Sequence, residues 1–293
     1  MNQEESENVK KRKGRKLLSP KLDVIFQALF GEVGNERITK KFLEAILDRK
    51  LEEIDLSGNI VLRREKLEDK MGVLDVLVKI NKNEYCNVEM QLIEKDKLLE
   101  RILYYWARIY TRNLKTGNDY MNLKKTIEVL IVNFEIKELK ELEYHSKWKI
   151  IEEKDRKLIL TEDLELHIIE IPKIYRTEGK EELEKWIYFI ENPESEKVGE
   201  YMKENKEMKE AKEKLEVMSE DERMQILAEL KEKAIRDEKA TERYGMKVGM
   251  ERGLKRGRRE NSKEIAKRMK EKGFDIKDIQ ELTKLTQKEI EGL

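Results

Sequence analysis

The sequence predicts an α/β fold, in which a mixed sheet is flanked by helices and followed by a helical C-terminal extension. Residues 71–91 are typical of two short strands joined by a polar turn. A long amphipathic helix then covers about 98–114, and a nearly all-apolar strand covers 126–134. A strand that is joined to a hairpin through a helix favours a mixed sheet with helices on its faces.

Two helices are expected before the hairpin. Ser19 followed by Pro20 is a typical helix start, and the apolar pattern that follows ends at Gly31. This first helix has a buried face made of Leu22, Ile25, Phe26, Leu29 and Phe30. A second helix over 35–48 buries Ile38, Phe42, Leu43, Ile46 and Leu47. Residues 60–64 are expected to form a strand that leads into the hairpin.

The hairpin has one apolar and one polar face, because side chains alternate along a strand. The second face carries Asp75, Leu77, Lys79, Asn87, Glu89 and Gln91. Keeping the apolar residues on one side predicts that Ile80 pairs with Glu84 across a three-residue loop, with Asn83 in the left-handed conformation. In this register Asp75 lies opposite Glu89.

Two carboxylates that face each other across a strand pair repel, so their presence needs a reason. A divalent cation is one, and Mg²⁺ prefers oxygen ligands such as Asp75 and Glu89. Such a metal polarises a phosphodiester and activates a water molecule. The alternative is that both residues are solvated on the exposed face of an edge hairpin, with Lys79 balancing their charge.

The helix over 98–114 carries two stripes. Its sheet-facing side is expected to hold Ile102, Tyr105, Ile109 and Leu114, and the stripe beside it holds Arg101, Tyr104, Arg108 and Arg112. A helix that follows the second hairpin strand packs beside the acidic pair, so Arg101 or Arg108 is placed to hold a phosphate. The aromatic residues 104–106 are either core or ligand contacts.

After the strand at 126–134, further strands are expected over 148–152 and 164–171, ended by Pro172. A helix over 181–190 closes this part of the chain before Pro193.

Several segments together indicate a family. They are LSPKLDVIFQALFG, FLEAILD, LDVLVKI, NVEMQ, RILYYWARIYTRNLKTGNDYMNLKKTIEVLIVNF and LELHIIEIPK, in this order over roughly residues 17–190. They resemble the Rpn family of recombination-promoting nucleases, also described as transposases. In particular, Asp75 and the triplet of Glu89, Met90 and Gln91 look like the second and third motifs of the PD-(D/E)XK nuclease superfamily.

The resemblance implies a restriction-endonuclease-like core and a Mg²⁺-dependent DNA endonuclease that hydrolyses phosphodiester bonds, in recombination, transposition or phage defence. It implies that Asp75 and Glu89 hold Mg²⁺, or Mn²⁺, and that Gln91 orients the attacking water in place of the usual lysine. Asp23 stands at the family's leading acidic position, with Glu44 as the alternative. Asp23 is equally suited to complement the dipole of its helix.

We expect four segments in the chain: a disordered basic tail at 1–18, a PD-(D/E)XK nuclease-like domain at 19–192, a charged helical linker at 193–260, and a small helical unit at 261–293. The tail either holds DNA through phosphates or acts as a solubilising terminus. The linker is dominated by Glu and Lys, which suits helices with solvated faces and helix pairing.

Glycine recurs at every fourth residue of the linker, at Gly245, Gly249, Gly253 and Gly257, among basic residues. On a helix these glycines form a smooth stripe that another helix or a phosphate backbone can approach closely. A homodimer through the C-terminal helices is therefore a candidate assembly. A basic flexible hinge is the alternative.

The last segment is expected to begin with a helix capped by Asn261 and ended by Gly273, followed by helices that start at Asp275 and at the capping box of Thr286 and Glu289. Its expected core is Ile265, Met269, Phe274, Ile276, Ile279, Leu282, Leu285 and Ile290. The spacing resembles a helix-turn-helix unit, with dimerisation or regulation as the alternative to DNA binding. A catalytically degenerate DNA-binding or assembly protein, acting through this region, is the second hypothesis for the whole chain.

Composition limits the other classes of function. Charged residues make up 43% of the chain but the net charge is zero, so DNA binding must come from local patches. A single cysteine and two histidines exclude a thiolate metal site and leave little material for a histidine-based one. Without a long apolar stretch or a signal peptide, the protein is expected in the cytoplasm.

Overall fold

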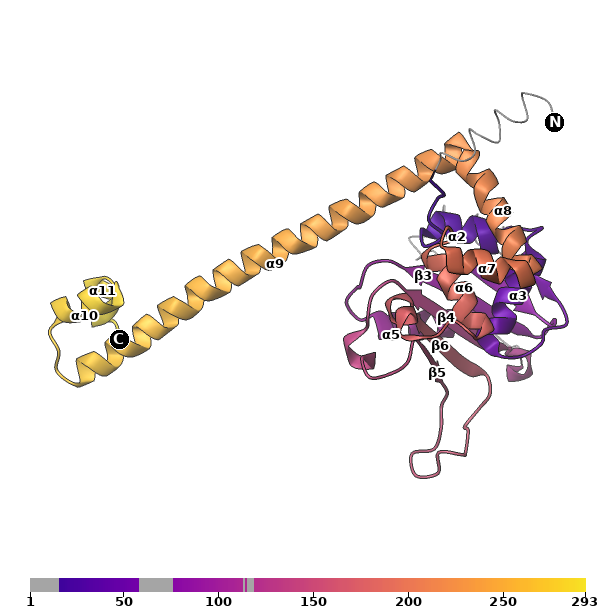
Figure 1. Ribbon diagram of the computed structural model, residues 1–293. Coiled ribbons are helices and arrows are strands. Elements are labelled where there is room, and N and C mark those ends of the chain that lie inside the picture. Colours follow the sequence, from indigo (N-terminus) through magenta and orange to yellow (C-terminus); the bar gives the residue numbers. More distant parts are fainter. Residues whose placement is uncertain (1–15, 58–75, 113, 115–118) are drawn as a thin grey trace, which may run out of the picture. The chain divides into compact units, whose positions relative to one another are not determined.

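The computed structural model describes residues 16–57, 76–112, 114 and 119–293 (Figure 1). The expected strand at 60–64, Asp75 and nearly all of the basic tail lie outside these residues. The chain divides into two compact units between Ile235 and Arg236, and each unit is described by itself.

The first unit is built on a six-stranded sheet with the order β1-β2-β3-β4-β6-β5. The strands are β1 (Ile54–Asp55), β2 (Val76–Ile80), β3 (Glu84–Gln91), β4 (Lys125–Val132), β5 (His145–Trp148) and β6 (Leu164–Glu170). β3, β4 and β6 run parallel to one another, whereas the remaining neighbours are antiparallel. The predicted mixed sheet is confirmed, with the two strands at 126–134 and 164–171 close to their expected bounds.

The register of the β2–β3 hairpin is confirmed. Ile80 pairs with Glu84, and pairing continues to Val76 and Val88, the last described pair. Alternation is confirmed as well, because the apolar side chains of both strands join one core, while Leu77 lies on the opposite face.

The three-residue loop is confirmed, but the prediction of its left-handed residue was wrong. The left-handed residues are Asn81 and Lys82, with φ of 46° and 62°, and Asn83 is not among the residues with positive φ. The backbone N–H of Asn83 donates to the carbonyl of Ile80 at 3.1 Å. Two consecutive left-handed residues in this loop match the twist of the flanking strands.

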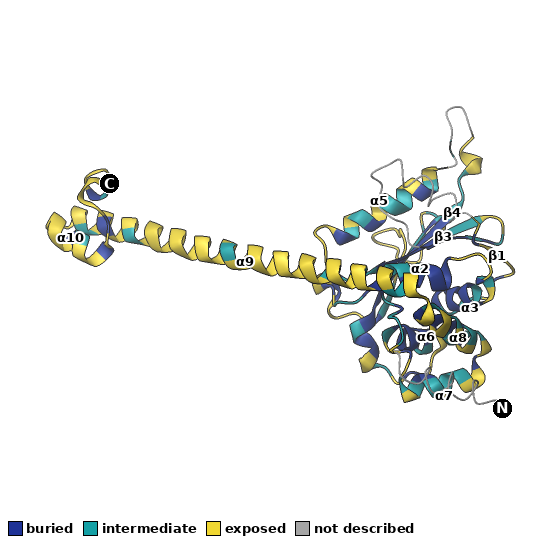
Figure 2. Cartoon of the chain, turned by 90° about the horizontal axis from the view of Figure 1, so that it is seen from above, coloured by how far each residue is buried: buried dark blue, intermediate teal, exposed yellow. Residues whose placement is uncertain are grey.

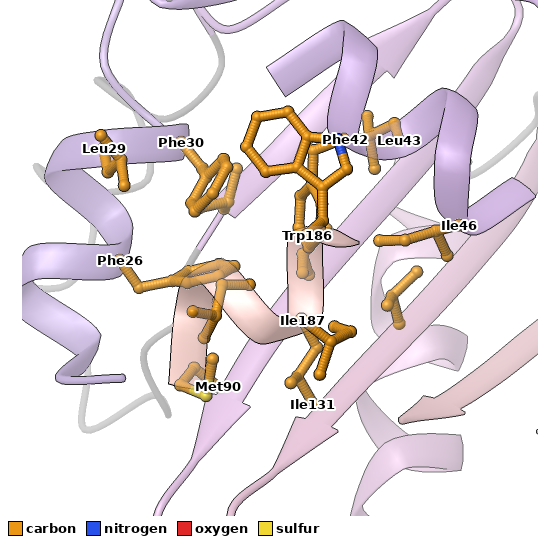
Figure 3. Close-up of a cluster of buried hydrophobic side chains, with 14 of the residues drawn as sticks. Phe26, Leu29, Phe30, Phe42, Leu43, Ile46, Met90, Ile131, Trp186 and Ile187 are labelled. Atoms are coloured by element: carbon orange, nitrogen blue, oxygen red, sulfur yellow. The ribbon is translucent and has the colours of Figure 1, made fainter. Parts of the chain in front are cut away.

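Five helices of the first unit form a layer on one face of the sheet, with α7 and α8 packed on the other helices. They are α2 (Asp23–Phe30), α3 (Glu36–Leu47), α6 (Glu182–Glu191), α7 (Glu196–Glu204) and α8 (Lys206–Glu220). Figure 3 shows the centre of this core, where Trp186 of α6 meets Phe42 and Phe30, at ring-centroid distances of 5.7 and 6.1 Å. The helices predicted over 35–48 and 181–190 are confirmed. The first helix begins at Asp23, after a turn from Ser19 to Leu22, and so starts later than its proline suggested.

The opposite face of the sheet is covered by α5 (Leu98–Thr111), which connects β3 to β4. Leu98 and Ile102 pack on Leu130 and on further apolar residues of β4 and β6, and Ile109 packs on the β2–β3 side. Figure 2 shows the mixed character of α5, whose turns are dark blue, teal and yellow. The helix between the hairpin and the next strand is as predicted, and the parallel pairing of β3 with β4 requires such a crossover.

Short 3₁₀ helices complete the unit: η1 (Tyr120–Asn122), η2 (Lys137–Leu139) and η3 (Ile171–Arg176). The strand predicted over 148–152 was wrong in position. β5 ends at Trp148, and Ile151 forms only an isolated bridge with Ile159. The apolar residues that suggested a strand there are exposed, with Ile150 at 39% and Ile151 at 44%. This segment continues past the end of β6, which begins at Leu164, so it has little of the sheet to pack on.

The charged segment after Pro193 contributes to the core of the first unit. Val198 of α7 and Met208, Ala211 and Leu215 of α8 are fully buried against the helices of the domain. A sparse apolar stripe on otherwise charged helices is enough to cover a helical layer.

In the remainder of the chain, α9 (Glu222–Glu271) includes all four glycines of the repeat. Asn261 lies inside α9, so the predicted cap at this residue was wrong. α10 (Ile276–Thr283) and α11 (Gln287–Glu291) follow, and Gly273 has φ of 79°. The capping box of Thr286 and Glu289 is confirmed.

The core of the small C-terminal unit differs in part from the prediction. Ile279, Leu285 and Ile290 are buried together with Ala266, and Met269 packs on them partly. Four predicted members are exposed instead, namely Ile265, Phe274, Ile276 and Leu282. Two short helices cover only one side of α9, and Ala266 rather than its neighbour Ile265 lies on that side.

Candidate active site

The face of β3 that looks toward α5 carries the polar residues. Cys86, Val88 and Met90 belong to the core on the other face, so Asn87, Glu89 and the end of the strand at Gln91 lie on the α5 side. This is the arrangement predicted from alternation, and it brings the acidic strand next to the helix with the two arginines.

Glu89 is buried, with 7% of its surface exposed. Its Oε1 lies 3.9 Å from Nη2 of Arg101 on α5, which is an ion pair without a hydrogen bond. Burial raises the pKa of Glu89, and the charges of Arg101 and Lys95 act in the opposite direction. A cation bound at Glu89 would favour the ionised carboxylate, so this position is suited to a metal ligand.

Arg101 and Arg108 lie on α5 as predicted, but only Arg101 reaches Glu89. Its Nη2 donates to the hydroxyl of Tyr105 at 3.3 Å, and its guanidinium lies 5.7 Å from the centre of that ring. Arg108 makes the same kind of contact with Tyr104, at 3.4 and 5.7 Å. Seven residues on a helix correspond to about 10 Å along its axis, so Arg108 lies farther from the acidic residue.

Gln91 ends β3, paired with Val132 of β4. Its Nε2 donates to the carbonyl of Ile93 at 2.9 Å, which holds the amide in one orientation. The amide group is therefore positioned by the backbone of the loop that leads to α5.

Asp23 and Glu44 are engaged elsewhere. The Oδ1 atom of Asp23 accepts from the N–H of Val24 at 2.8 Å, and its Oδ2 is 2.5 Å from Nζ of Lys231. Glu44 accepts from the N–H of Leu51 at 3.0 Å and pairs with Lys50. Both residues belong to helices of the face opposite α5, and the described contacts do not join either of them to Glu89.

A buried pair beside Glu89 was missed from the sequence. Nδ2 of Asn87 donates to Oε1 of Glu128 on β4 at 2.7 Å, and both side chains are completely buried. The signal was a glutamate in the middle of an otherwise apolar strand. Lys95, whose charge lowers the pKa of Glu89, was missed as well.

Both histidines lie in a separate cluster. His145 and His167 are joined by a hydrogen bond of 2.9 Å between Nε2 and Nδ1, and Nε2 of His167 is 2.9 Å from Glu165. The hydrogen bond from His167 lowers the pKa of Glu165 to about 2, and burial lowers that of His145 to about 3. The cluster is a hydrogen-bonded chain between β5 and β6.

Within the described residues, no three side chains of His, Cys, Asp or Glu converge on a metal position. Asp75, the second predicted ligand, is outside them. The donor set that the sequence offers, two carboxylates and an amide, has the oxygen chemistry that suits a hard divalent cation. No helix in the described part of the chain has both the length and the apolar character that a membrane span requires.

A hairpin whose second strand carries a buried acid, followed by a crossover helix and a parallel strand, forms an α/β core that fits the PD-(D/E)XK nuclease type. Comparison with protein families agrees. Residues 20–245 match the model of a family described as PD-(D/E)XK nuclease family transposase, and the chain belongs to this family. Neither a curated protein nor a solved structure matches the chain. Nucleases of this superfamily generally use divalent metal ions.

Proposed function

We propose that the protein is a Mg²⁺-dependent DNA endonuclease that hydrolyses phosphodiester bonds in recombination, transposition or phage defence, as the resemblance to Rpn nucleases implies. The observation that carries the proposal is the position of Glu89, a buried carboxylate 3.9 Å from Arg101 on the strand that the family motif predicts. Family membership supports a nuclease-type activity.

In this proposal Asp75 and Glu89 hold the metal, Mg²⁺ or Mn²⁺, which when bound supplies charge to the phosphodiester and an activated water. Glu89 must be ionised to act as a ligand. Because burial raises its pKa, protons compete with the cation for this carboxylate.

Gln91 positions the water. Its amide is held by the carbonyl of Ile93, and the amide oxygen accepts a hydrogen bond from the water. A neutral amide cannot supply the positive charge of a lysine, so Arg101 provides the cation that steadies the phosphate. The 3.9 Å contact lets this guanidinium turn from Glu89 to a substrate oxygen without breaking a hydrogen bond to the carboxylate.

The proposal includes DNA as partner, a second copy of the chain through the C-terminal helices, and a cytoplasmic location. The pairing would use Gly245, Gly249, Gly253 and Gly257 of α9, which leave the surface of the helix open, because a Cβ atom added at any of them would meet nothing within 4 Å outside the helix's own backbone. The free, buried Cys86 agrees with a reducing compartment.

The experiment is cleavage of supercoiled plasmid by the purified protein with Mg²⁺, with Mn²⁺ and with EDTA. Glu89→Gln and Asp75→Asn keep the shape of each side chain and should abolish nicking, whereas Glu162→Gln, in an exposed ion pair, should not change it. DNA binding is measured on the same variants. A wild-type protein that binds plasmid but leaves it intact with both metals contradicts the enzyme and favours the binding or assembly protein.

A further inference from the structure

One side of α5 carries a continuous row of arginine and tyrosine side chains that begins, partly buried, at the candidate active site and ends exposed. Arg101 contacts Glu89 and lies over Tyr105, whose ring centre is 5.7 Å from that of Tyr104. Arg108 lies over Tyr104 at 5.7 Å. We call these four residues of α5 the arginine–tyrosine row.

None of the four residues belongs to the buried core, although Arg101 and Tyr105 are partly buried. Ile102 and Ile109 supply the buried contacts of α5, and the indole of Trp106 is held by the carbonyl of Thr126 at 2.9 Å. Tyr104 is 56% exposed, and Arg108 is exposed beside it. The sequence left open whether residues 104–106 are core residues or ligand contacts. Trp106 packs against β4, whereas Tyr104 is exposed and available to a ligand.

The chemistry of the row selects a ligand. Arginines suit phosphate oxygens, and a tyrosine ring or a guanidinium plane suits the flat face of a nucleobase. In a continuous duplex each base face is covered by its neighbours, and only base edges reach the grooves. An unpaired base offers its face.

We propose that Tyr104 and Tyr105, flanked by Arg101 and Arg108, stack an unpaired nucleobase next to the phosphate that is cleaved. The substrate is then DNA with single-stranded nucleotides, such as a gap, a fork or a free strand, in preference to continuous duplex. This inference rests on the proposed function, because it places the base beside the proposed site of hydrolysis.

The test is a binding measurement on the full chain in EDTA, so that cleavage does not take part. A labelled single-stranded DNA containing 2-aminopurine, the same strand in a duplex, and an RNA strand of the same sequence are titrated with protein. Fluorescence anisotropy gives the affinity, and quenching of 2-aminopurine reports stacking. The variants are Tyr104→Ala, Tyr104→Phe and the control Tyr175→Ala, a tyrosine that is 65% exposed and packs on Tyr188 of α6, on the other face of the sheet.

The wild type should bind single-stranded DNA more tightly than duplex or RNA and quench the probe. Tyr104→Ala should lose about fivefold or more in affinity for the single strand, together with the quenching. Tyr104→Phe and Tyr175→Ala should retain both. Equal or tighter binding of duplex or RNA, or full quenching by Tyr104→Ala, overturns the inference.

The proposed function can fail separately. A protein that shows the tyrosine-dependent preference but cleaves neither plasmid nor gapped DNA with Mg²⁺ or Mn²⁺ supports the stacking row and contradicts the endonuclease. Cleavage that depends on Asp75 and Glu89, without a preference for single-stranded DNA, supports the endonuclease and contradicts the stacking row.

Discussion

Glu89 is the residue whose environment bears most directly on chemistry. Burial disfavours its charged form, and the nearby Arg101 favours it. In a metal-dependent reaction only the ionised form binds the cation, so the rate should fall as the pH decreases through the pKa of this carboxylate.

Replacing Arg101 by Gln should move that fall to higher pH, because the charge that lowers the pKa of Glu89 is lost. Loss of the phosphate contact should also reduce the rate, by roughly 10²-fold. The measurement is the initial rate of plasmid nicking across a pH series at saturating Mg²⁺. Arg108→Gln is the matched control on the same helix, and its profile should keep the wild-type midpoint. An unchanged midpoint in Arg101→Gln would mean that this arginine does not act on Glu89.

Sequence reasoning at this scale succeeded where the pattern is local. Strand alternation placed Glu89 and Gln91 on one face, and helical spacing placed Arg101 beside Glu89. It missed the bond from Asn87 to Glu128, because the parallel pairing of β3 with β4 joins residues 41 positions apart and no local pattern encodes it. No local pattern encodes the ion pair of Asp23 with Lys231 either. This pair engages the carboxylate of Asp23, which was predicted for the metal site.

At the scale of elements, the hairpin shows how a correct register can accompany a wrong turn. The apolar face determines which residues pair, whereas the turn depends on which residues tolerate positive φ. Asn81 has a second role there, since its Oδ1 accepts from the N–H groups of Glu52 and Glu53 at 2.9 and 3.2 Å. These bonds join the turn to the chain before β1 and explain why the asparagine lies at this position.

Lys82→Gly should stabilise the protein by about 1 kcal/mol, because a lysine in the left-handed conformation costs about that much and a glycine does not. Asn83→Gly should be neutral or destabilise by up to about 1 kcal/mol, since Asn83 has no positive φ. Urea unfolding of both variants provides the comparison. A stabilising Asn83→Gly with a destabilising Lys82→Gly would support a left-handed Asn83 instead.

At the scale of the whole molecule, composition did not indicate that the first unit extends to Ile235. The segment after Pro193 is so rich in Glu and Lys that a linker is the natural interpretation, yet α7 and α8 bury a stripe of apolar residues on the domain. The fold class, the mixed sheet and most helices could be predicted, because each has its own periodicity. The packing of α7 and α8 could not be predicted, because a few apolar residues in a charged segment indicate burial only when the surface they pack on is known.

A chain that ends at residue 192 should therefore fail to fold cooperatively, whereas one that ends at residue 235 should fold. Burial of Val198, Met208 and Leu215 contributes about 5–9 kcal/mol at 1.5–3 kcal/mol each, which is comparable with the total stability of a domain. Near-ultraviolet circular dichroism and urea unfolding of the two chains distinguish the outcomes. Native-like unfolding of the shorter chain would show that α7 and α8 are dispensable.

The most direct test of the central claim, that Glu89 is a metal ligand of a nuclease site, is calorimetric titration of Mn²⁺ into the wild type and Glu89→Gln, with Glu162→Gln as control. The wild type and the control should bind Mn²⁺ alike, with an affinity that weakens as the pH falls. Glu89→Gln should bind at least about tenfold more weakly, which corresponds to 1.4 kcal/mol. Equal Mn²⁺ affinity in Glu89→Gln and the wild type would contradict the claim.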